Sequence, residues 1–310
     1  MKEYSSAAAF TSGRQTVVTI GTFDGVHIGH KAILHRLVAT AKKEDLDSVL
    51  LTFFPHPRMV LQTDTSLQLI NTISEKKELL QQTGLDHLVI HPFTHAFSRL
   101  TAVEYVRDIL VNKLRAKKII IGYDHRFGRN RTATIEDLRD FGKTYHFEVE
   151  EISAQELDEV AVSSTKIRRA LLAGDITTAN NFLGYPFMLT GTVIKGKRIG
   201  RTLAYPTANL HIAENYKLIP KNGVYVVRSN IDGNTAYGIT SIGTNPTVGG
   251  TETTIETYFL DLDMDLYNRS LRIEFLTHIR DEAHFKDVDL LKQAIEKDEQ
   301  FARSYLDTHE

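Results

Sequence analysis

Hydrophobic and polar positions change their period in a regular way along the first half of the chain. Short apolar runs typical of buried strands occur at residues 17–20, 47–53, 87–91, 118–122 and 146–151. Helical patterns separate them, at residues 29–43, 74–83, 102–114 and 135–143. This alternation predicts a parallel sheet with helices on both faces, in which ligands bind beyond the carboxyl ends of the strands.

The pattern changes near Gly184-Tyr185-Pro186. Two helical segments, residues 165–173 and 175–183, give way to short β-rich stretches that glycines interrupt as far as about Phe275. Such spacing predicts an antiparallel β-barrel. An amphipathic pattern at residues 288–305 predicts a final helix that closes this barrel.

The length and composition are sufficient for two globular domains. The chain has 310 residues, of which 42% are hydrophobic and 25% charged, so it can bury two cores. We therefore expect an α/β protein with a parallel-sheet domain in residues 1–184 and a barrel domain in residues 185–310. The absence of cysteine excludes disulfides, iron–sulfur clusters and thiol nucleophiles.

Charge and hydropathy limit the classes of partner. A net charge of −2 argues against a general nucleic-acid binder. The first residues, MKEYSSAAAF, hold too short an apolar run for a signal peptide, and no apolar stretch approaches membrane-spanning length. The sequence predicts a soluble, cytoplasmic protein, a monomer or weak homo-oligomer, which binds small molecules and neither nucleic acid nor membranes.

One stretch, TVVTIGTFDGVHIGHK at residues 16–31, carries the clearest chemistry. A strand that turns through glycines into a helix start presents free N–H groups and a positive dipole end, which attract phosphate. His27 and His30 lie three residues apart, so both can reach one side of that turn, protonated or hydrogen-bonded to phosphate oxygen. The glycines fit neither G-x-G-x-x-G nor G-x-x-x-x-G-K-[ST]. The alternatives are a glycine-rich turn with two surface histidines, and a zinc site that uses both.

Two basic segments follow in the first half. Residues 122–131, GYDHRFGRNR, lie after a predicted strand, and their arginines suit the phosphate of a second substrate. Residues 162–169, VSSTKIRR, open a helix with capping hydroxyls, and the cations in its first turns oppose the helix dipole unless phosphate binds there. The alternatives are a solvated charged loop and a capped helix with exposed basic residues.

The second half offers oxygen donors and an isolated acid. Three glycines interrupt its first strands and mark turns or close approach to a ligand: Gly191, Gly196 and Gly200. In Pro206-Thr207-Ala208-Asn209, a hydroxyl and an amide carbonyl lie two residues apart, a donor set that suits Mg²⁺, although such a sequence is also typical of a turn. Glu256 stands alone in an apolar strand, TIETYFLDL, as either a general base or a polar residue on the solvent face.

The first-half segments together resemble a known enzyme family. GTFDGVHIGH contains the H-x-G-H signature of nucleotidylyltransferases, and with TFFPHP, GYDHRFG and VSSTKIR it resembles the adenylyltransferase half of bacterial riboflavin biosynthesis proteins. This implies a Rossmann-like domain in which ATP binds at Gly21, Phe23, Asp24, His27, Gly29, His30, Ser164, Thr165 and Arg168, with His27 and His30 catalytic. The flavin nucleotide is expected near Pro55, His56, Asp124, Arg126 and Arg129. Thr132-Ala133 departs from the family, which has a glycine after the last arginine.

The second-half motifs resemble riboflavin kinase. They are G-x-V-x-x-G, P-T-A-N, G-V-Y, S-I-G-x-N-P-T, I-E, L-Y and R-x-E-x-x-F, in that order. The resemblance implies ATP at Gly191, Gly196, Gly200, Thr207 and Asn209, Mg²⁺ on Thr207 and Asn209, a base at Glu256, and flavin at Arg280 and Glu282. Ala204-Tyr205 and Tyr258 depart mildly from the family pattern.

The two resemblances imply a bifunctional enzyme. It is expected to phosphorylate riboflavin to FMN with ATP and Mg²⁺, and then to join FMN to AMP from a second ATP, yielding FAD and pyrophosphate. One alternative is a nucleotidylyltransferase for another phosphorylated acceptor, such as a pantetheine phosphate. The other is a catalytically silent flavin- or nucleotide-binding regulator. The kinase-like second half argues against the first, and the intact motifs argue against the second.

Overall fold

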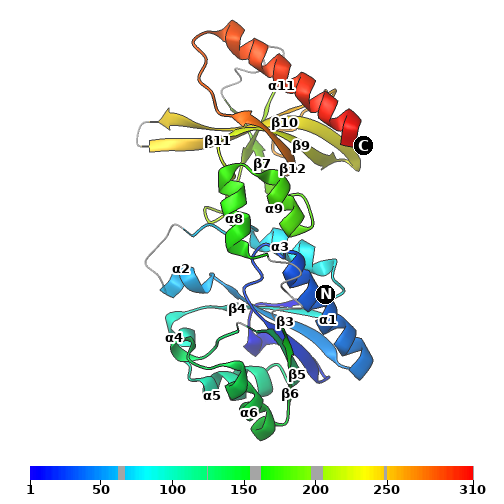
Figure 1. The fold of residues 1–310 in the computed structure, drawn as a ribbon, viewed down its shortest axis with the longest axis vertical. Coiled ribbons are helices and arrows are strands. Elements are labelled where there is room, and N and C mark those ends of the chain that lie inside the picture. The colour runs from blue at the N-terminus through cyan, green and yellow to red at the C-terminus, as the bar shows by residue number, and fades with distance from the viewer. Residues whose placement is uncertain (62–66, 124, 154–161, 197–204, 248–249, 310) are drawn as a thin grey trace. The chain divides into compact units, whose positions relative to one another are not determined.

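The computed structural model describes residues 1–61, 67–123, 125–153, 162–196, 205–247 and 250–309. Contacts divide the chain into two units, shown in Figure 1. The first contains Met1–Leu69 and Ile73–Ser163, and the second contains Ile70–Thr72 and Ser164–Glu310. By contacts, therefore, the helical segments before Gly184 group with the second unit, whereas the predicted domain boundary lies after that residue.

The first unit is built on a six-stranded sheet in which all neighbours are parallel. In spatial order its strands are β1 (Lys2–Tyr4), β4 (His87–Pro92), β3 (Asp47–Phe54), β2 (Thr16–Ile20), β5 (Ala116–Gly122) and β6 (Glu148–Ile152). Every residue of β2 is buried, as expected for a central strand covered on both faces. The predicted parallel sheet is confirmed.

Helices cover this sheet. They are α1 (Ile28–Glu44), α2 (Pro57–Leu61), α3 (Ile73–Gln81), α4 (His95–Ser98), α5 (Ala102–Glu104), η2 (Tyr105–Val111) and α6 (Ile135–Tyr145), with short 3₁₀ turns η1 (Ala7–Ala9) and η3 (Arg129–Arg131). One sheet face packs Val18, Val49 and Ile119 against η2 and α6. Helix α1 lies against β2, β3 and β5. Both faces thereby gain the apolar cover that the strands require.

Two local features differ from the sequence pattern. The strand β1 was not predicted, because its three residues, Lys2–Tyr4, are mostly exposed and carry no apolar run. The predicted helix 102–114 begins as α5 but continues as the π-helix η2. There the N–H groups of Asn112 and Leu114 donate to carbonyls five residues earlier, at 2.9 Å each.

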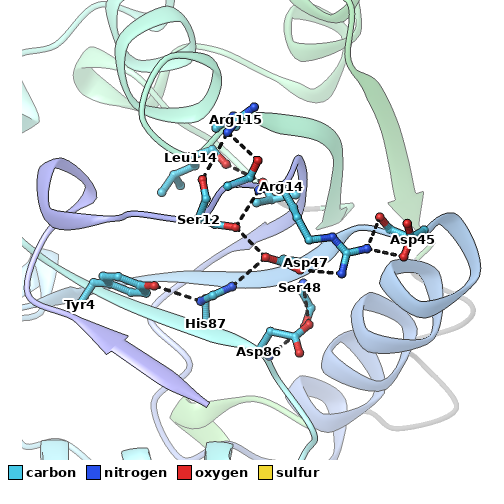
Figure 2. A network of polar contacts seen from close by, with 12 residues as sticks. Tyr4, Ser12, Arg14, Asp45, Asp47, Ser48, Asp86, His87, Leu114 and Arg115 are labelled. Carbon is cyan, nitrogen blue, oxygen red and sulfur yellow. Dashed lines mark hydrogen bonds and ion pairs between the residues drawn. The ribbon is translucent and has the colours of Figure 1, made fainter.

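A polar network ties together the amino ends of the parallel strands (Figure 2). At the start of β3, Asp47 accepts a hydrogen bond from the Ser12 hydroxyl (2.6 Å) and lies 3.1 Å from Nε2 of His87. The other ring nitrogen of His87 lies 3.3 Å from the Tyr4 hydroxyl, which connects β1 to the sheet. Because this network occupies the amino edge, it is separate from the carboxyl edge, where ligands of parallel sheets bind.

The second unit is a closed barrel of six antiparallel strands. Around the barrel they are β10 (Asn234–Thr247), β11 (Gly250–Phe259), β8 (Ala208–His211), β7 (Met188–Ile194), β12 (Ser270–Asp281) and β9 (Gly223–Ile231). Two helices precede the barrel, α8 (Ser164–Ala173) and α9 (Ile176–Leu183), and α11 (Val288–His309) follows it. The predicted barrel and final helix are confirmed.

Helix α11 covers one outer face of the barrel. Ala302 is fully buried against a cluster that includes Ile239 and Leu260. The buried carboxylate of Asp298 accepts hydrogen bonds from Nε (2.9 Å) and Nη2 (2.8 Å) of Arg280, at the end of β12. This paired, charge-assisted contact fastens the helix to the barrel.

Candidate functional site

The first site lies where β2 passes into α1. The loop from Gly21 to His27 follows the carboxyl end of β2, and His27 caps α1 by accepting the backbone N–H of His30 at Nδ1 (3.3 Å). Two loop residues other than glycine adopt left-handed backbone conformations, Phe23 (φ 46°) and Val26 (φ 36°). For a β-branched residue this conformation is strained, and such strain is concentrated at functional sites.

Three aromatic rings pack together in this loop. The His27 and His30 rings are 3.6 Å apart between centroids and nearly parallel, and the Phe23 ring lies 4.6 Å from that of His30 at a tilt of 33°. A Cβ atom at Gly21 would come within 2.9 Å of the Phe23 ring, and one at Gly29 within 3.3 Å of the His27 ring. The two glycines therefore leave the space in which the rings pack, and the prediction that both histidines lie on one side of the turn is confirmed.

Burial controls the charge of both histidines. It lowers the pKa of His27 to about 4, against the opposing attraction of Asp24. Burial, together with the positive charges of His27 and Lys76, holds the pKa of His30 well below 6.5. Both rings are therefore neutral at neutral pH in the free protein. Because Nδ1 of His27 accepts a hydrogen bond, its proton is assigned to Nε2, so His27 offers an N–H donor.

Two buried charged residues lie in or against the loop. Asp24, which was predicted, and Lys76 on α3, which was not, are 1% and 3% exposed. The Lys76 ammonium donates to the Thr22 carbonyl at 2.7 Å. Lys76 was missed because ISEKKELLQ resembles a charged surface helix. A signal existed, since Lys76 is spaced three and four residues from the apolar Leu79 and Leu80, on the same helical face.

The other predicted groups of the first unit follow neighbouring strands. Pro55 and His56 come after β3, and the peptide bond before Pro55 is cis. The exposed Arg126 and Arg129 come after β5, with Nε of Arg129 donating to a backbone carbonyl at 3.0 Å. Because β3, β2 and β5 are parallel neighbours, these segments share the carboxyl edge of the sheet with the histidine loop, Gly21–His30. Asp124 lies outside the described residues.

Ser164, Thr165 and Arg168 lie in the first turns of α8, which belongs to the second unit. Their side chains are at least partly exposed. Their expected contact with ATP phosphates stays a prediction.

The second site lies between β8 and β11 of the barrel. The Thr207 hydroxyl donates to Oε2 of Glu256 at 3.1 Å, although 49 residues separate them. Asn209 pairs with Glu256 in the strand register. A Cβ atom at Gly196 would lie 2.3 Å from the Asn209 side-chain nitrogen, so this glycine allows the backbone to approach the amide closely. Four predicted residues thus meet in one place.

The burial pattern of β11 fixes the face on which Glu256 lies. Ile255, Thr257 and Phe259 are buried, whereas Glu256 and Tyr258 between them are partly exposed. The carboxylate therefore lies on the outer face of the barrel, within reach of solvent and of a ligand, as the alternation in the sequence predicted.

The remaining predicted barrel residues have protein partners. Glu282 accepts hydrogen bonds from the Thr244 N–H (3.1 Å) and the Asn222 side chain (2.9 Å), and Arg280 is paired with Asp298. These contacts account for both side chains structurally, so their flavin roles stay predictions. At Gly191, a Cβ atom would lie 2.3 Å from the His211 carbonyl, so the strands approach closely there. Gly200 lies outside the described residues.

None of the helices within the described ranges combines the length and apolar character needed to cross a membrane. Among these residues, no three histidine or acidic side chains gather in a way that could hold a metal ion.

Comparisons with known proteins assign a family to each part of the chain. The FAD synthetase family model matches residues 10–166, and the riboflavin kinase model matches residues 183–306. The bifunctional riboflavin kinase/FMN adenylyltransferase of Buchnera aphidicola subsp. Schizaphis graminum is 36% identical over 294 residues, 94% of each chain. Those of Listeria monocytogenes and Escherichia coli strain K12 are also 36% identical, over 93% of this chain and 92% of theirs.

A solved structure supports the same architecture over nearly the whole chain. It is described as a macrolide-efflux protein from Streptococcus pneumoniae, is 31% identical, and has a TM-score of 0.89 over 97% of this chain and 98% of its own. With both family models matched and relatives of one function aligned along almost the full length, the chain belongs to the family of bifunctional riboflavin kinases/FMN adenylyltransferases, which make FMN from riboflavin and FAD from FMN.

Proposed function

We propose that the two reactions use separate sites: FMN is adenylylated at the loop Gly21–His30, and riboflavin is phosphorylated beside Glu256 on the barrel. Neither reaction needs a covalent enzyme intermediate, because both are in-line displacements at phosphorus that depend on positioning and charge stabilisation. Each reaction thus has its own set of residues.

At the first site, the chain contributes hydrogen-bond donors for the triphosphate of ATP. The first-turn N–H groups of α1 and its dipole attract anionic oxygens. His27 adds its Nε2–H, and the buried Nδ1 of His30 has no hydrogen-bond partner among the described residues, which leaves it available to a ligand. An FMN phosphate oxygen attacks the α-phosphorus of ATP while the bond to the leaving pyrophosphate breaks. His30 contacts the negative charge that develops on this leaving group.

The basic loop after β5 supplies the second substrate's contacts. Arg126 and Arg129 are exposed at the same sheet edge as the histidine loop, where a guanidinium can pair with the FMN phosphate. Pro55 and His56 border the same edge after β3. Together these segments fit a flavin nucleotide that approaches ATP from beside it.

At the second site, Glu256 acts as the general base. A ribityl hydroxyl is a weak nucleophile, and a carboxylate in hydrogen-bond reach orients it and accepts its proton as its oxygen bonds to the γ-phosphorus. The observation that carries this assignment is the hydrogen bond from Thr207 to Oε2 of Glu256, which orients the carboxylate, and we assign the substrate hydroxyl to its other oxygen.

The donors beside Glu256 fit a magnesium ion. Mg²⁺ prefers oxygen ligands and is commonly held by few protein groups together with substrate phosphates. The Thr207 hydroxyl and the Asn209 amide oxygen supply such ligands, and a hydroxyl can keep its hydrogen bond to Glu256 while its oxygen binds a cation. When bound, Mg²⁺ neutralises phosphate charge. Cytoplasmic location and oligomeric state stay predictions.

The substitution Glu256→Gln tests the kinase assignment, since it keeps the size of the side chain and removes its basicity. Riboflavin phosphorylation should fall by about 10²–10⁴, while adenylylation of supplied FMN is unchanged. Glu274→Gln is the matched control, because Glu274 is paired with Arg228 at 2.7 Å on another strand. A Glu256→Gln variant that keeps more than about a tenth of the wild-type kinase turnover would show that Glu256 is a polar surface residue and not the general base.

A further inference from the structure

Lys76 is a buried cation that the two reactions leave without a role. It lies on α3, is 3% exposed, and its ammonium donates to the Thr22 carbonyl at 2.7 Å. The same carbonyl accepts the hydroxyl of the fully buried Thr52, on β3, at 3.1 Å. Both lone pairs of the Thr22 oxygen are thereby engaged, from two different elements.

The Thr22 carbonyl lies at the beginning of the histidine loop. Thr22 directly precedes Phe23, the first left-handed residue, so fixing this peptide plane fixes the direction in which the loop leaves the sheet. The strained conformations of Phe23 and Val26 are unfavourable by themselves and persist only where surrounding contacts determine them. A donor on each side of the Thr22 oxygen is such a determinant.

An ammonium is an expensive group to bury for a structural hydrogen bond alone. Its desolvation is strongly unfavourable, and this burial lowers the pKa of Lys76, against the attraction of Asp24. A neutral donor such as the Thr52 hydroxyl already serves the same carbonyl. The placement of a cation there points to a function for its charge.

We propose that Lys76 is a positioning residue for FMN adenylylation: its ammonium holds the Thr22 carbonyl and thereby orients the loop that presents His27 and His30 to the triphosphate. This inference rests on the proposed role of the histidine loop. Among the described residues, the charged groups that shift the pKa of His30 are His27 and Lys76. Asp24 in turn acts on the pKa of each of these two residues. The positive charge of Lys76 disfavours a second cation on His30, so the ring stays a neutral hydrogen-bonding group until phosphate binds.

Lys76→Met tests the proposal, because methionine fills a similar volume without charge or donor. The kcat/KM for ATP in adenylylation should fall by about 10- to 100-fold, as expected when reacting groups are displaced by about 1 Å. Riboflavin phosphorylation by the same preparation should be unchanged. The acid limb of the adenylylation pH profile should move to higher pH, because His30 then lacks a repelling neighbour. A lysine whose charge does not act on His30 would leave that limb in place.

Two further variants complete the test. Lys77→Met is the matched control, since Lys77 is the next residue of α3 and forms a surface ion pair with Glu3, and it should behave as wild type. Thr52→Val removes the other donor to Thr22 without changing charge, so it should reduce adenylylation without moving the acid limb. This variant also serves if Lys76→Met does not fold.

The outcomes separate this inference from the proposed function. A Lys76→Met enzyme with wild-type adenylylation and pH profile, or one that loses kinase and adenylylation equally, overturns the role of Lys76. If Lys76→Met is well folded, a normal Thr52→Val enzyme would also argue against the anchoring of Thr22. If His30→Ala keeps full adenylylation while Lys76→Met loses it, the proposed role of His30 fails instead.

Discussion

Acidification should destabilise the protein through His27, and replacing this histidine with asparagine should remove the effect. The ring is 6% exposed and its pKa is lowered to about 4 by burial, from 6.5 in an ordinary setting. Below pH 6.5, therefore, His27 is protonated in the unfolded chain, whereas in the folded chain it becomes protonated only near pH 4. Since the unfolded state holds more protons in this window, the free energy of unfolding falls as the pH falls.

The size of the effect follows from the difference between the two pKa values. Each pKa unit corresponds to about 1.4 kcal/mol, so His27 contributes a loss of about 3 kcal/mol once the pH is below 4. Between pH 7 and pH 5, where part of the window has been crossed, the loss is about 2 kcal/mol. His30, with its pKa also lowered, acts in the same direction.

His27→Asn is a well-matched variant, because the asparagine side-chain oxygen can accept the His30 N–H in place of Nδ1 and keep the helix cap. His35→Asn, at an exposed position of the same helix, is the control. Urea denaturation followed by circular dichroism at pH 7 and pH 5 measures the change. Wild type and His35→Asn should lose about 2 kcal/mol more than His27→Asn. Equal losses in all three proteins would show that His27 is not a buried neutral base.

Two other predictions concern the barrel. Gly196→Ala should abolish most riboflavin phosphorylation and spare FMN adenylylation, because the Cβ atom of the new alanine would lie 2.3 Å from the Asn209 side chain. Wild-type turnover of riboflavin by this variant would refute the prediction. A fragment of residues 164–310 should unfold at a higher temperature than a fragment of residues 185–310, because the Asn180 side-chain amide on α9 donates to the Phe275 carbonyl at 2.8 Å. Equal melting temperatures of the two fragments, measured by circular dichroism, would contradict this prediction.

The fold was largely predictable, because the hydrophobic periodicity and the length of each segment indicate the main helices and strands. The buried run of β2 and the apolar faces of α1 and α6 are local properties of the sequence. Strand β1 was not predictable in this way, because it forms only by pairing with β4, from Lys2 opposite His87 to Tyr4 opposite Val89. The π-helical hydrogen bonding of η2 likewise depends on tertiary packing, and the pattern of apolar residues does not indicate it.

The candidate sites show the same division. The spacing of His27 and His30 indicated that both side chains would lie on one side of the turn, and alternation placed Glu256 on the outer face. The spacing did not indicate the charge of the two rings, which are neutral because they are buried. It also did not indicate that Lys76 is buried while the next residue, Lys77, forms an ion pair at the surface. Charge states and long-range partners depend on the whole fold, so they were not available from local sequence.

The most direct test of two separate sites in one chain is a time course with the His30→Ala variant. The enzyme is incubated with riboflavin, ATP and Mg²⁺, and the flavins are separated by chromatography. FMN should accumulate at the wild-type rate with FAD formation reduced by about 10²–10³, and adding the Glu256→Gln variant to the same mixture should restore FAD. FAD made by His30→Ala alone at the wild-type rate would contradict the assignment of adenylylation to the histidine loop.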